Sequence, residues 1–242
     1  MRQRMLDDSS LIRKRVSPPF QFVEGHVRQN PPPSPPFLLP EVLLNSLVIQ
    51  VTHAVLGKGV KNAYYSGNVN LPGSKEQPVH VDRGQLWANL DVAPPASHLV
   101  INVPLVDIDA SNGVTEFWPG SHRETSRSLH QQLCLPQEKL ALRRASVPPV
   151  RPAIRCGSAI IRDMRLWHRG TPNRSSTARP MIAMIHCCEW IATDPITFQH
   201  GTEAFFEHPI LTTHAQFTDA PIDYLDQSQA YYDPAHSPRQ LS

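Results

Sequence analysis

The amino-acid sequence predicts a mainly β protein, either an antiparallel sandwich or a barrel, with flanking helices. Short apolar runs separated by proline and glycine are typical of such folds. The chain contains 25 prolines against 11 glycines, and proline disfavours a helical bundle because it removes a backbone donor and breaks helix interiors. A length of 242 residues also suits a single β domain, so we expect one domain over residues 1–242.

The N-terminal segment, residues 1–40, is expected to be extended and proline-rich. Its densest cluster is Pro31-Pro32-Pro33-Ser34-Pro35-Pro36. Such a cluster can be a partner-binding polyproline segment or an extended connector, and we favour the connector. Residues 1–16 are basic, but they contain Asp7 and Asp8 and lack an apolar core. We therefore expect neither a secretory signal nor an organelle transit peptide.

The first helix is predicted over residues 40–57. Pro40 stands at the first helical position, and Gly57 stands where the helix would end. The apolar residues between them give a mostly apolar face, which we expect to pack against the outside of a sheet. These residues are Val42, Leu43, Leu47, Val48, Val51, Val55 and Leu56.

Farther along the chain, apolar runs bounded by proline, glycine or polar turns are expected to be strands. They cover residues 99–106, 115–118, 153–161 and 181–190. We expect residues 126–142 to be helical or irregular and residues 202–206 to form a short helix. Residues 231–242 are expected to be a loose polar tail.

Charge and cysteine content narrow the possible functions. The formal net charge is +2 and no block of like charges occurs, which argues against binding to nucleic acid or to a membrane surface. No apolar stretch reaches the roughly 18 residues of a spanning helix. Cysteine spacing gives no CxxC motif, so we expect buried free thiols, a reducing compartment and a cytoplasmic location. The cysteines are Cys134, Cys156, Cys187 and Cys188.

The motif H-x-[DE], a candidate part of a metal site, occurs as His80-x-Asp82 and as His122-x-Glu124. With 12 histidines and 21 acidic residues, about one match is expected by chance, so the context has to separate the two. His122 directly follows a Pro-Gly-Ser turn, and we interpret it as a turn-stabilising residue with a hydrogen-bonding role. His80 and Asp82 share one face of a strand, because they are two residues apart, and can reach the same ion.

Two more residues, both far downstream of Asp82 in the sequence, complete this candidate site. His168 follows a strand-turn-strand pattern and offers a second imidazole. Two histidines and one carboxylate are the ligand set that holds Fe(II) on one face and leaves the other positions open. Arg179 stands at the start of the apolar run 181–190. Because a buried arginine is costly unless it meets an anion, we expect Arg179 to bind a carboxylate bidentately.

Three sequence blocks resemble the phytanoyl-CoA dioxygenase family of Fe(II)- and 2-oxoglutarate-dependent oxygenases. They are residues 68–87 (NVNLPGSKEQPVHVDRGQLW), 112–125 (NGVTEFWPGSHRET) and 162–185 (RDMRLWHRGTPNRSSTARPMIAMI). The resemblance spans roughly residues 20–226. It implies a double-stranded β-helix, which is a cupin-like jelly roll.

The resemblance also implies residue roles, with 2-oxoglutarate and O₂ as cosubstrates. The implied iron ligands are His80, Asp82 and His168, and the implied 2-oxoglutarate contacts are Arg179, Gln77 and Thr115. One departure is Gly170, where some relatives have a serine that contacts 2-oxoglutarate. The segment before His80 is short for the family, so either the region that often shapes substrate entry is reduced or the sequence is part of a longer chain.

The expected reaction is hydroxylation, or another oxidation of a C–H bond, with release of succinate and CO₂. Asp82 argues against halogenation, because halogenase relatives have a small residue at that position. Two alternatives remain. One is a zinc-dependent hydrolase, since imidazole and carboxylate ligands serve both metals, and the other is a non-catalytic jelly-roll binding protein. Arg179 favours iron over zinc, and the intact ligand set counts against a scaffold.

The expected substrate is a small organic molecule, either natural-product-like or lipid-like. Asn70 and Tyr65, just before the metal motif, and Trp118 are the candidate substrate contacts. Trp87 and Trp167 also lie within or beside the motif blocks and can wall a pocket. We favour a core position for all three tryptophans, because burial is the usual role of aromatic residues in strands.

Overall fold

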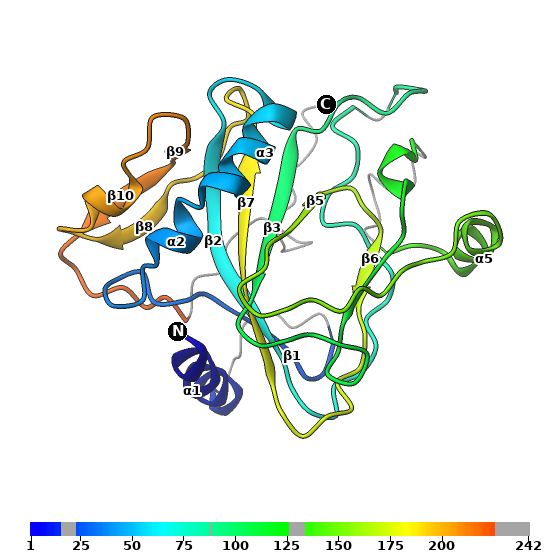
Figure 1. Ribbon diagram of the computed structural model, residues 1–242, viewed down its shortest axis with the longest axis horizontal. Coiled ribbons are helices and arrows are strands. Elements are labelled where there is room, and N and C mark those ends of the chain that lie inside the picture. Colours follow the sequence, from blue (N-terminus) through cyan, green and yellow to red (C-terminus); the bar gives the residue numbers. More distant parts are fainter. Residues whose placement is uncertain (16–22, 88, 126–133, 226–242) are drawn as a thin grey trace.

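The computed structural model describes residues 1–15, 23–87, 89–125 and 134–225. Within these residues the largest sheet has six strands in the order β1-β2-β7-β3-β5, and β9 also pairs with β2. The pairs along this order are antiparallel, whereas β9 lies parallel to β2. Figure 1 shows the long strands β2, β7 and β3 side by side at the centre of the molecule. The strands are β1 (His26–Gln29), β2 (Lys61–Asn70), β3 (His98–Pro104), β5 (Ile160–Asp163), β7 (Arg179–Cys187) and β9 (Thr212–Thr213).

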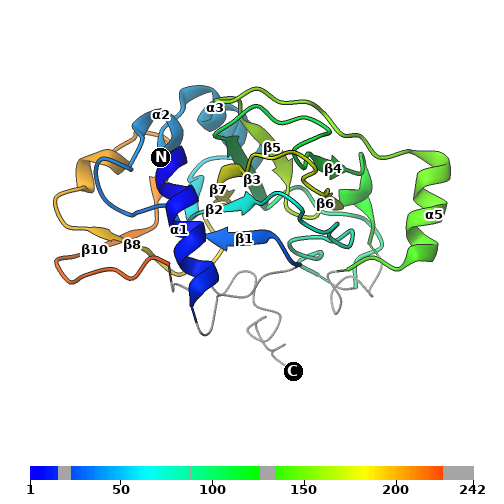
Figure 2. The same ribbon diagram turned by 90° about the horizontal axis from the view of Figure 1, so that it is seen from below.

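Two shorter sheets complete the β structure of the described residues. β4 (Thr115–Phe117) pairs antiparallel with β6 (His168–Gly170), and β8 (Ile196–Gln199) pairs parallel with β10 (Ala215–Thr218). Isolated bridges widen the β4–β6 sheet, from Phe117 to Val150 and from His168 to His80. Figure 2 shows β8 and β10 at the opposite end of the molecule from β4 and β6.

Successive residues of the central strands point to opposite faces of the main sheet. In β3, Ile101 and Val103 lie in the largest apolar core. Val100 and Asn102 alternate with these two residues in the sequence and line a cavity on the other face. Because both faces are covered, all residues of β3 are buried. The β4–β6 sheet also lines this cavity, which therefore lies between two layers of strands.

The predicted helix over residues 40–57 is divided into α2 (Pro40–Leu43) and α3 (Ser46–Leu56). Pro40 begins α2 and Gly57 ends α3, as expected. The division occurs at Asn45, whose side chain accepts a hydrogen bond from the Val48 N–H and so begins a new helix. The predicted apolar face is partly wrong: Leu47, Val51 and Val55 are exposed. Val48, Ile49, Thr52 and Leu56 form the buried face instead.

The segment 1–40 is not extended throughout, which corrects the sequence-based expectation. Residues Arg2–Lys14 form helix α1, and β1 pairs with the edge of β2. Met5 and Ile12 are seven residues apart on one helix face, and both lie fully buried in the core beside the main sheet. Proline does not oppose this helix, because the first proline of the chain is Pro18.

The other predicted elements differ from the structure mainly in their bounds. β3, β4 and β7 occupy the expected regions, and η2 (Glu203–Phe206) is the expected short helix. The strand expected over 153–161 begins only at Ile160 in β5, because a turn at Cys156 and Gly157 interrupts it. Asp107 stabilises this turn by accepting the Cys156 N–H at 2.7 Å. In the segment 126–142, residues 126–133 lie outside the described residues, 134–136 are not helical, and α5 (Gln137–Ser146) begins at Gln137. The tail 231–242 also lies outside the described residues.

The cysteines are free, as expected, but only half of them are buried. Cys187 and Cys188 lie in the interior at the end of β7, whereas Cys134 and Cys156 are exposed. In the described parts of the chain, no helix has the length and apolarity needed to cross a membrane.

Gly113 provides a test of how tightly the loop before β4 is packed. Its φ is +87°, and an added Cβ would overlap the carboxamide of buried Asn70 and lie 3.0 Å from the Thr171 carbonyl oxygen. We expect Gly113→Ala to lower the free energy of unfolding by about 2 kcal/mol or more, because backbone strain adds to overpacking. Gly73→Ala is the matched control, since Gly73 has a φ of +76° and open space around it. Equal losses for the two variants, measured by chemical denaturation, would contradict this prediction.

Candidate metal centre and cosubstrate cavity

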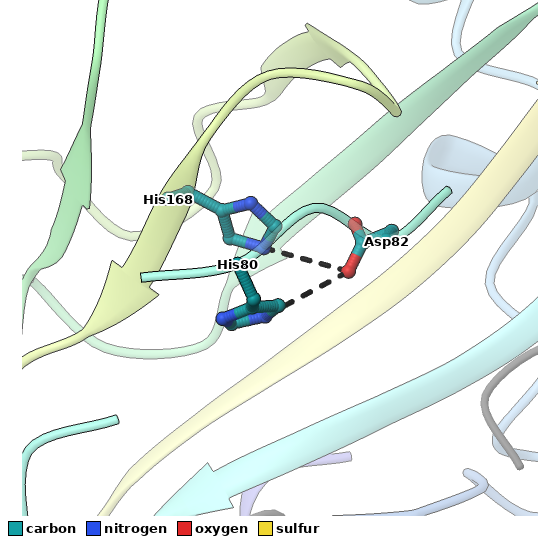
Figure 3. Close-up of side chains that lie close together, drawn as sticks. All are labelled: His80, Asp82 and His168. Carbon is teal, nitrogen blue, oxygen red and sulfur yellow. Dashed lines mark ion pairs between the residues drawn. The ribbon is translucent and has the colours of Figure 1, made fainter. Parts of the chain in front are cut away.

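The side chains of His80, Asp82 and His168 converge at one point of the cavity wall (Figure 3). Nε2 of His168 lies 3.5 Å from Oδ1 of Asp82, and Nε2 of His80 lies 3.9 Å from the same oxygen. The three ligand atoms all lie within 4.8 Å of one another. Two imidazole nitrogens and one carboxylate oxygen at this separation can hold one metal ion on a single face.

The backbone fixes this convergence although His80 and Asp82 do not lie in a named strand. The His80 N–H donates to the His168 carbonyl at 2.9 Å, and the His168 N–H donates back to the His80 carbonyl at 3.0 Å. The Asp82 N–H donates to the Met164 carbonyl at 3.2 Å. The motif segment is therefore paired with β6 and the turn before it. Locally extended backbone places His80 and Asp82 on one side, as expected from their spacing.

The second nitrogen of each ring fixes the tautomer of the two histidines. Nδ1 of His80 lies 2.9 Å from the Pro78 carbonyl oxygen, and Nδ1 of His168 lies 2.9 Å from the Leu166 carbonyl oxygen. A carbonyl oxygen can only accept, so Nδ1 carries the proton in both rings. The lone pair of each Nε2 is then directed toward Asp82 and is available to a metal.

Electrostatics favours the protonation states that metal binding requires. Burial lowers the pKa of His80 to about 3, and the charge of His168 acts in the same direction. The His80 imidazole is thus neutral at pH 7. Burial is the largest single influence and would raise the pKa of Asp82, but Arg162, His168 and His80 together outweigh it and hold this pKa below its usual range. Nη2 of Arg162 lies 2.5 Å from Oδ2 of Asp82.

The other H-x-[DE] motif, His122-x-Glu124, takes no part in this cluster of described residues. His122 lies in the short helix η1 (Ser121–Arg123). The carbonyl oxygens of His122 and Glu124 both accept hydrogen bonds from the side chain of Gln85, each at 3.0 Å. The expected role of His122 in the turn therefore rests on its backbone.

The cavity beside the metal cluster has a volume of about 180 Å³. It is lined by all six residues for which the sequence predicts metal or cosubstrate binding: His80, Asp82, His168, Arg179, Gln77 and Thr115. Asp82 is the one acidic residue among the described side chains that line it.

Arg179 begins β7 and is only 2% exposed. Its Nη1 donates to Oδ1 of Asn68 at 3.0 Å, and its Nε has no partner among the described residues. Burial lowers the pKa of Arg179 to about 10, so the side chain remains charged at pH 7. No carboxylate of the described chain compensates this charge. A buried cation in a cavity wall without a counter-ion is typical of an anion site.

Gly170, the departure noted in the sequence, lies directly against His26 of β1. A Cβ at this position would be 2.6 Å from Cε1 of His26 and 2.9 Å from Oε1 of Gln77. The His26 ring thus fills the space that a serine side chain would need. Gln77 also accepts the Gly170 N–H at 2.6 Å, which fixes its carboxamide at the cavity wall.

The three candidate substrate contacts do not line the cavity, which contradicts their predicted role. Tyr65 faces the opposite side of the main sheet, where it is 2% exposed and packs in the core. The Asn70 side chain is fully buried and donates from Nδ2 to the Thr171 carbonyl at 3.0 Å and to the Gly113 carbonyl at 3.5 Å. Trp118 is fully buried with Trp167 in a separate apolar cluster, so the core interpretation holds for these two. Trp87 is 47% exposed and stacks on exposed Trp190, so neither role applies to it.

Several cavity residues were missed by sequence reasoning. They alternate along the strands of the main sheet, where period-two spacing was the available signal. They include His26, Arg28, Tyr64, Asn68, Asn102 and Arg162.

The family model described as "Phytanoyl-CoA dioxygenase (PhyH)" matches residues 38–181, which is more than half of the chain. Among solved structures, AviO1 from Streptomyces viridochromogenes Tue57 is 23% identical with a TM-score of 0.55, over 80% of this chain and 84% of that chain.

Two further solved structures share the fold. HygX from Streptomyces hygroscopicus, with nickel, 2-oxoglutarate and hygromycin B bound, is 14% identical with a TM-score of 0.53, over 86% of each chain. EvdMO1 is 21% identical with a TM-score of 0.52, over 76% of this chain and 44% of that chain. This chain thus spans less than half the length of EvdMO1. These likenesses confirm the predicted mainly β jelly roll.

Proposed function

Because this chain belongs to the phytanoyl-CoA dioxygenase family of Fe(II)- and 2-oxoglutarate-dependent oxygenases, we propose that it oxidises a C–H bond of a small organic molecule and releases succinate and CO₂. One observation carries the proposal. The His80, Asp82 and His168 cluster shares a single cavity with Arg179, a buried cation that no described carboxylate compensates. A metal and a dicarboxylate are the two ligands that such a cavity suits.

The donor set fits Fe(II). His80 and His168 each offer Nε2, because Nδ1 of each ring is bonded to a backbone carbonyl, and Asp82 offers a carboxylate whose second oxygen is held by Arg162. When bound, iron supplies the oxidising chemistry, and the protein supplies ligands, orientation and exclusion of water. The backbone bridge between His80 and His168 keeps the two rings in place before any metal arrives, so little reorganisation is needed on binding.

Three further residues are proposed to bind 2-oxoglutarate. Arg179 pairs with the carboxylate far from the metal, and Asn68 orients its guanidinium through Nη1. Gln77 and Thr115 line the cavity on the opposite layer and complete the polar contacts. The arrangement is supported by HygX, a protein of the same fold whose structure holds nickel and 2-oxoglutarate.

The substrate is proposed to be small. The cavity volume of about 180 Å³ lies below the roughly 300–1,000 Å³ of drug-sized ligand sites. A natural product or part of one is consistent with HygX, which holds hygromycin B in its structure. We further propose a reducing, cytoplasmic location, because all four cysteines are free.

The iron chelate can be tested by spectroscopy without a substrate. Anaerobic addition of Fe(II) and 2-oxoglutarate to the purified protein is expected to give a weak visible charge-transfer band. Zn(II) in place of Fe(II) gives no such band and is the control. If the band is absent at saturating Fe(II) and 2-oxoglutarate, the proposed function is wrong, and a zinc hydrolase or a binding protein becomes the better explanation.

A further inference from the structure

Arg162 is a second buried arginine of the cavity wall. It lies in β5 directly opposite Val100 of β3, and both residues line the cavity. Its side chain is 8% exposed and contacts Asp82, one of the proposed metal ligands. Arg162 thus stands on the main-sheet wall immediately beside the position where a metal would bind.

The hydrogen-bonding capacity of Arg162 is largely unused. A guanidinium has five N–H donors, and the bond from Nη2 to Asp82 Oδ2 uses one of them. Nε and Nη1 are buried and have no partner in the described parts of the chain. Buried donors without partners are uncommon and costly, so each needs an explanation. The position of Arg162 on the cavity wall allows one such explanation, namely an oxygen-bearing ligand in the cavity that accepts hydrogen bonds from these donors.

The charges of the loaded site lead to the same conclusion, which here rests on the proposed function. A divalent iron and the 2-oxoglutarate dianion cancel. Asp82 is the one acidic group among the described lining residues. Its single negative charge balances only one of the two positive charges of the buried arginines, Arg162 and Arg179. Arg28 is a further cation on the wall. At least one positive charge is therefore left over, and buried charges are normally paired.

We propose that Arg162 binds an anionic group of the substrate, and that the substrate is a small organic acid with a carboxylate. The carboxylate would replace the missing acceptor of Arg162 and balance the remaining charge. Val100 and the carboxamide of Asn102, which flank Arg162 on the neighbouring strand, form the wall next to it. This placement holds the rest of the acid beside the metal ligands, at the β5 side of the main sheet. Arg179, the proposed 2-oxoglutarate anchor, stands on β7 of the same sheet, with β3 between them.

The test compares acids with their amides, which have the same shape without the charge. Benzoate and benzamide, and hexanoate and hexanamide, are titrated anaerobically into protein that holds Fe(II) and 2-oxoglutarate. Binding is followed by calorimetry and by the change in the visible band, so no turnover is required. We expect at least one acid to bind about tenfold or more tightly than its amide, because charge-assisted hydrogen bonds are the stronger ones.

Three variants assign the preference to a residue. Arg162→Gln is expected to remove the preference for the acid, and Arg162→Lys is expected to keep it in part because the charge remains. Arg155→Gln changes the net charge equally at an exposed site outside the cavity, and we expect it to keep the full preference. If every acid and amide bind alike to the wild type, or if no acid binds, the assignment is overturned.

The competing source of a carboxylate is 2-oxoglutarate itself. Because Arg162 also contacts the proposed metal ligand Asp82, the Kd of 2-oxoglutarate in the Arg162→Gln variant is measured from the same band at saturating Fe(II), and this Kd separates the two. A Kd within about twofold of wild type supports a substrate site, whereas a tenfold rise without any acid preference in the wild type overturns it. If the wild type forms no band at all, the proposed function fails, and that outcome differs from the failure of the Arg162 assignment.

Discussion

Asp82→Ala is expected to abolish 2-oxoglutarate-dependent succinate formation, with a fall of roughly a hundredfold or more. Loss of even an outer partner of a metal ligand commonly costs about 10–100-fold, and Asp82 is proposed to be a ligand itself. The substitution removes the single carboxylate from the cluster and leaves Arg162 unpaired beside two histidines. Iron affinity, measured by calorimetry under anaerobic conditions, is expected to fall together with turnover.

The control for Asp82→Ala has to separate lost chemistry from lost stability. Breaking a buried ion pair costs about 3–5 kcal/mol, so some destabilisation is expected even if the fold survives. Asp163→Ala is the matched variant, because Asp163, with a side chain 12% exposed, pairs with Arg165 at 2.7 Å but does not line the cavity. We expect Asp163→Ala to lower stability and retain turnover. Unchanged turnover in Asp82→Ala would remove Asp82 from the metal site.

Arg179→Leu is expected to raise the KM for 2-oxoglutarate by about thirtyfold or more. Truncating one partner of a buried charge pair costs about 2 kcal/mol or more, and about 1.4 kcal/mol corresponds to a factor of ten. The measurement is succinate formation against 2-oxoglutarate concentration at saturating Fe(II). The iron affinity should stay near that of the wild type, because Arg179 does not belong to the metal cluster.

Two related variants sharpen the test of Arg179. Arg179→Lys keeps the charge but loses the planar fork, so an intermediate KM is expected. Asn68→Ala removes the acceptor that orients Nη1, and a smaller rise in KM is expected because the cation remains. An unaltered KM in Arg179→Leu would mean that the carboxylate of 2-oxoglutarate is anchored elsewhere, and Arg28 would be the next residue to replace.

The metal cluster was predictable because its chemistry leaves a signal in the sequence. His80 and Asp82 are two residues apart, so any locally extended backbone places them on one side. Arg179 was predictable because an arginine at the start of an apolar strand needs a reason to be there. The β class of the fold followed from proline and glycine between apolar runs.

The missed residues depend on contacts that a single sequence does not contain. Arg162 is one of 23 lysines and arginines, and its partner Asp82 is reached only through the pairing of distant strands. Tyr64 rather than Tyr65 lines the cavity, and the register of β2 shifts between Asn62 and Tyr65, which alternation alone does not reveal. Helix α1 was missed because it has no side-chain N-cap and buries only a few apolar residues, among them Met5 and Ile12.

The reciprocal backbone bonds between His80 and His168 make assembly of the site depend on folding of the chain. The two ligands are distant in the chain, so they meet only when non-local strand pairing is complete, and such contacts form slowly. A nascent or unfolded chain offers an incoming metal His80 and Asp82 without His168. Metal binding is therefore linked by mass action to the native state, and occupancy of the site rises with the fraction of molecules that are fully folded.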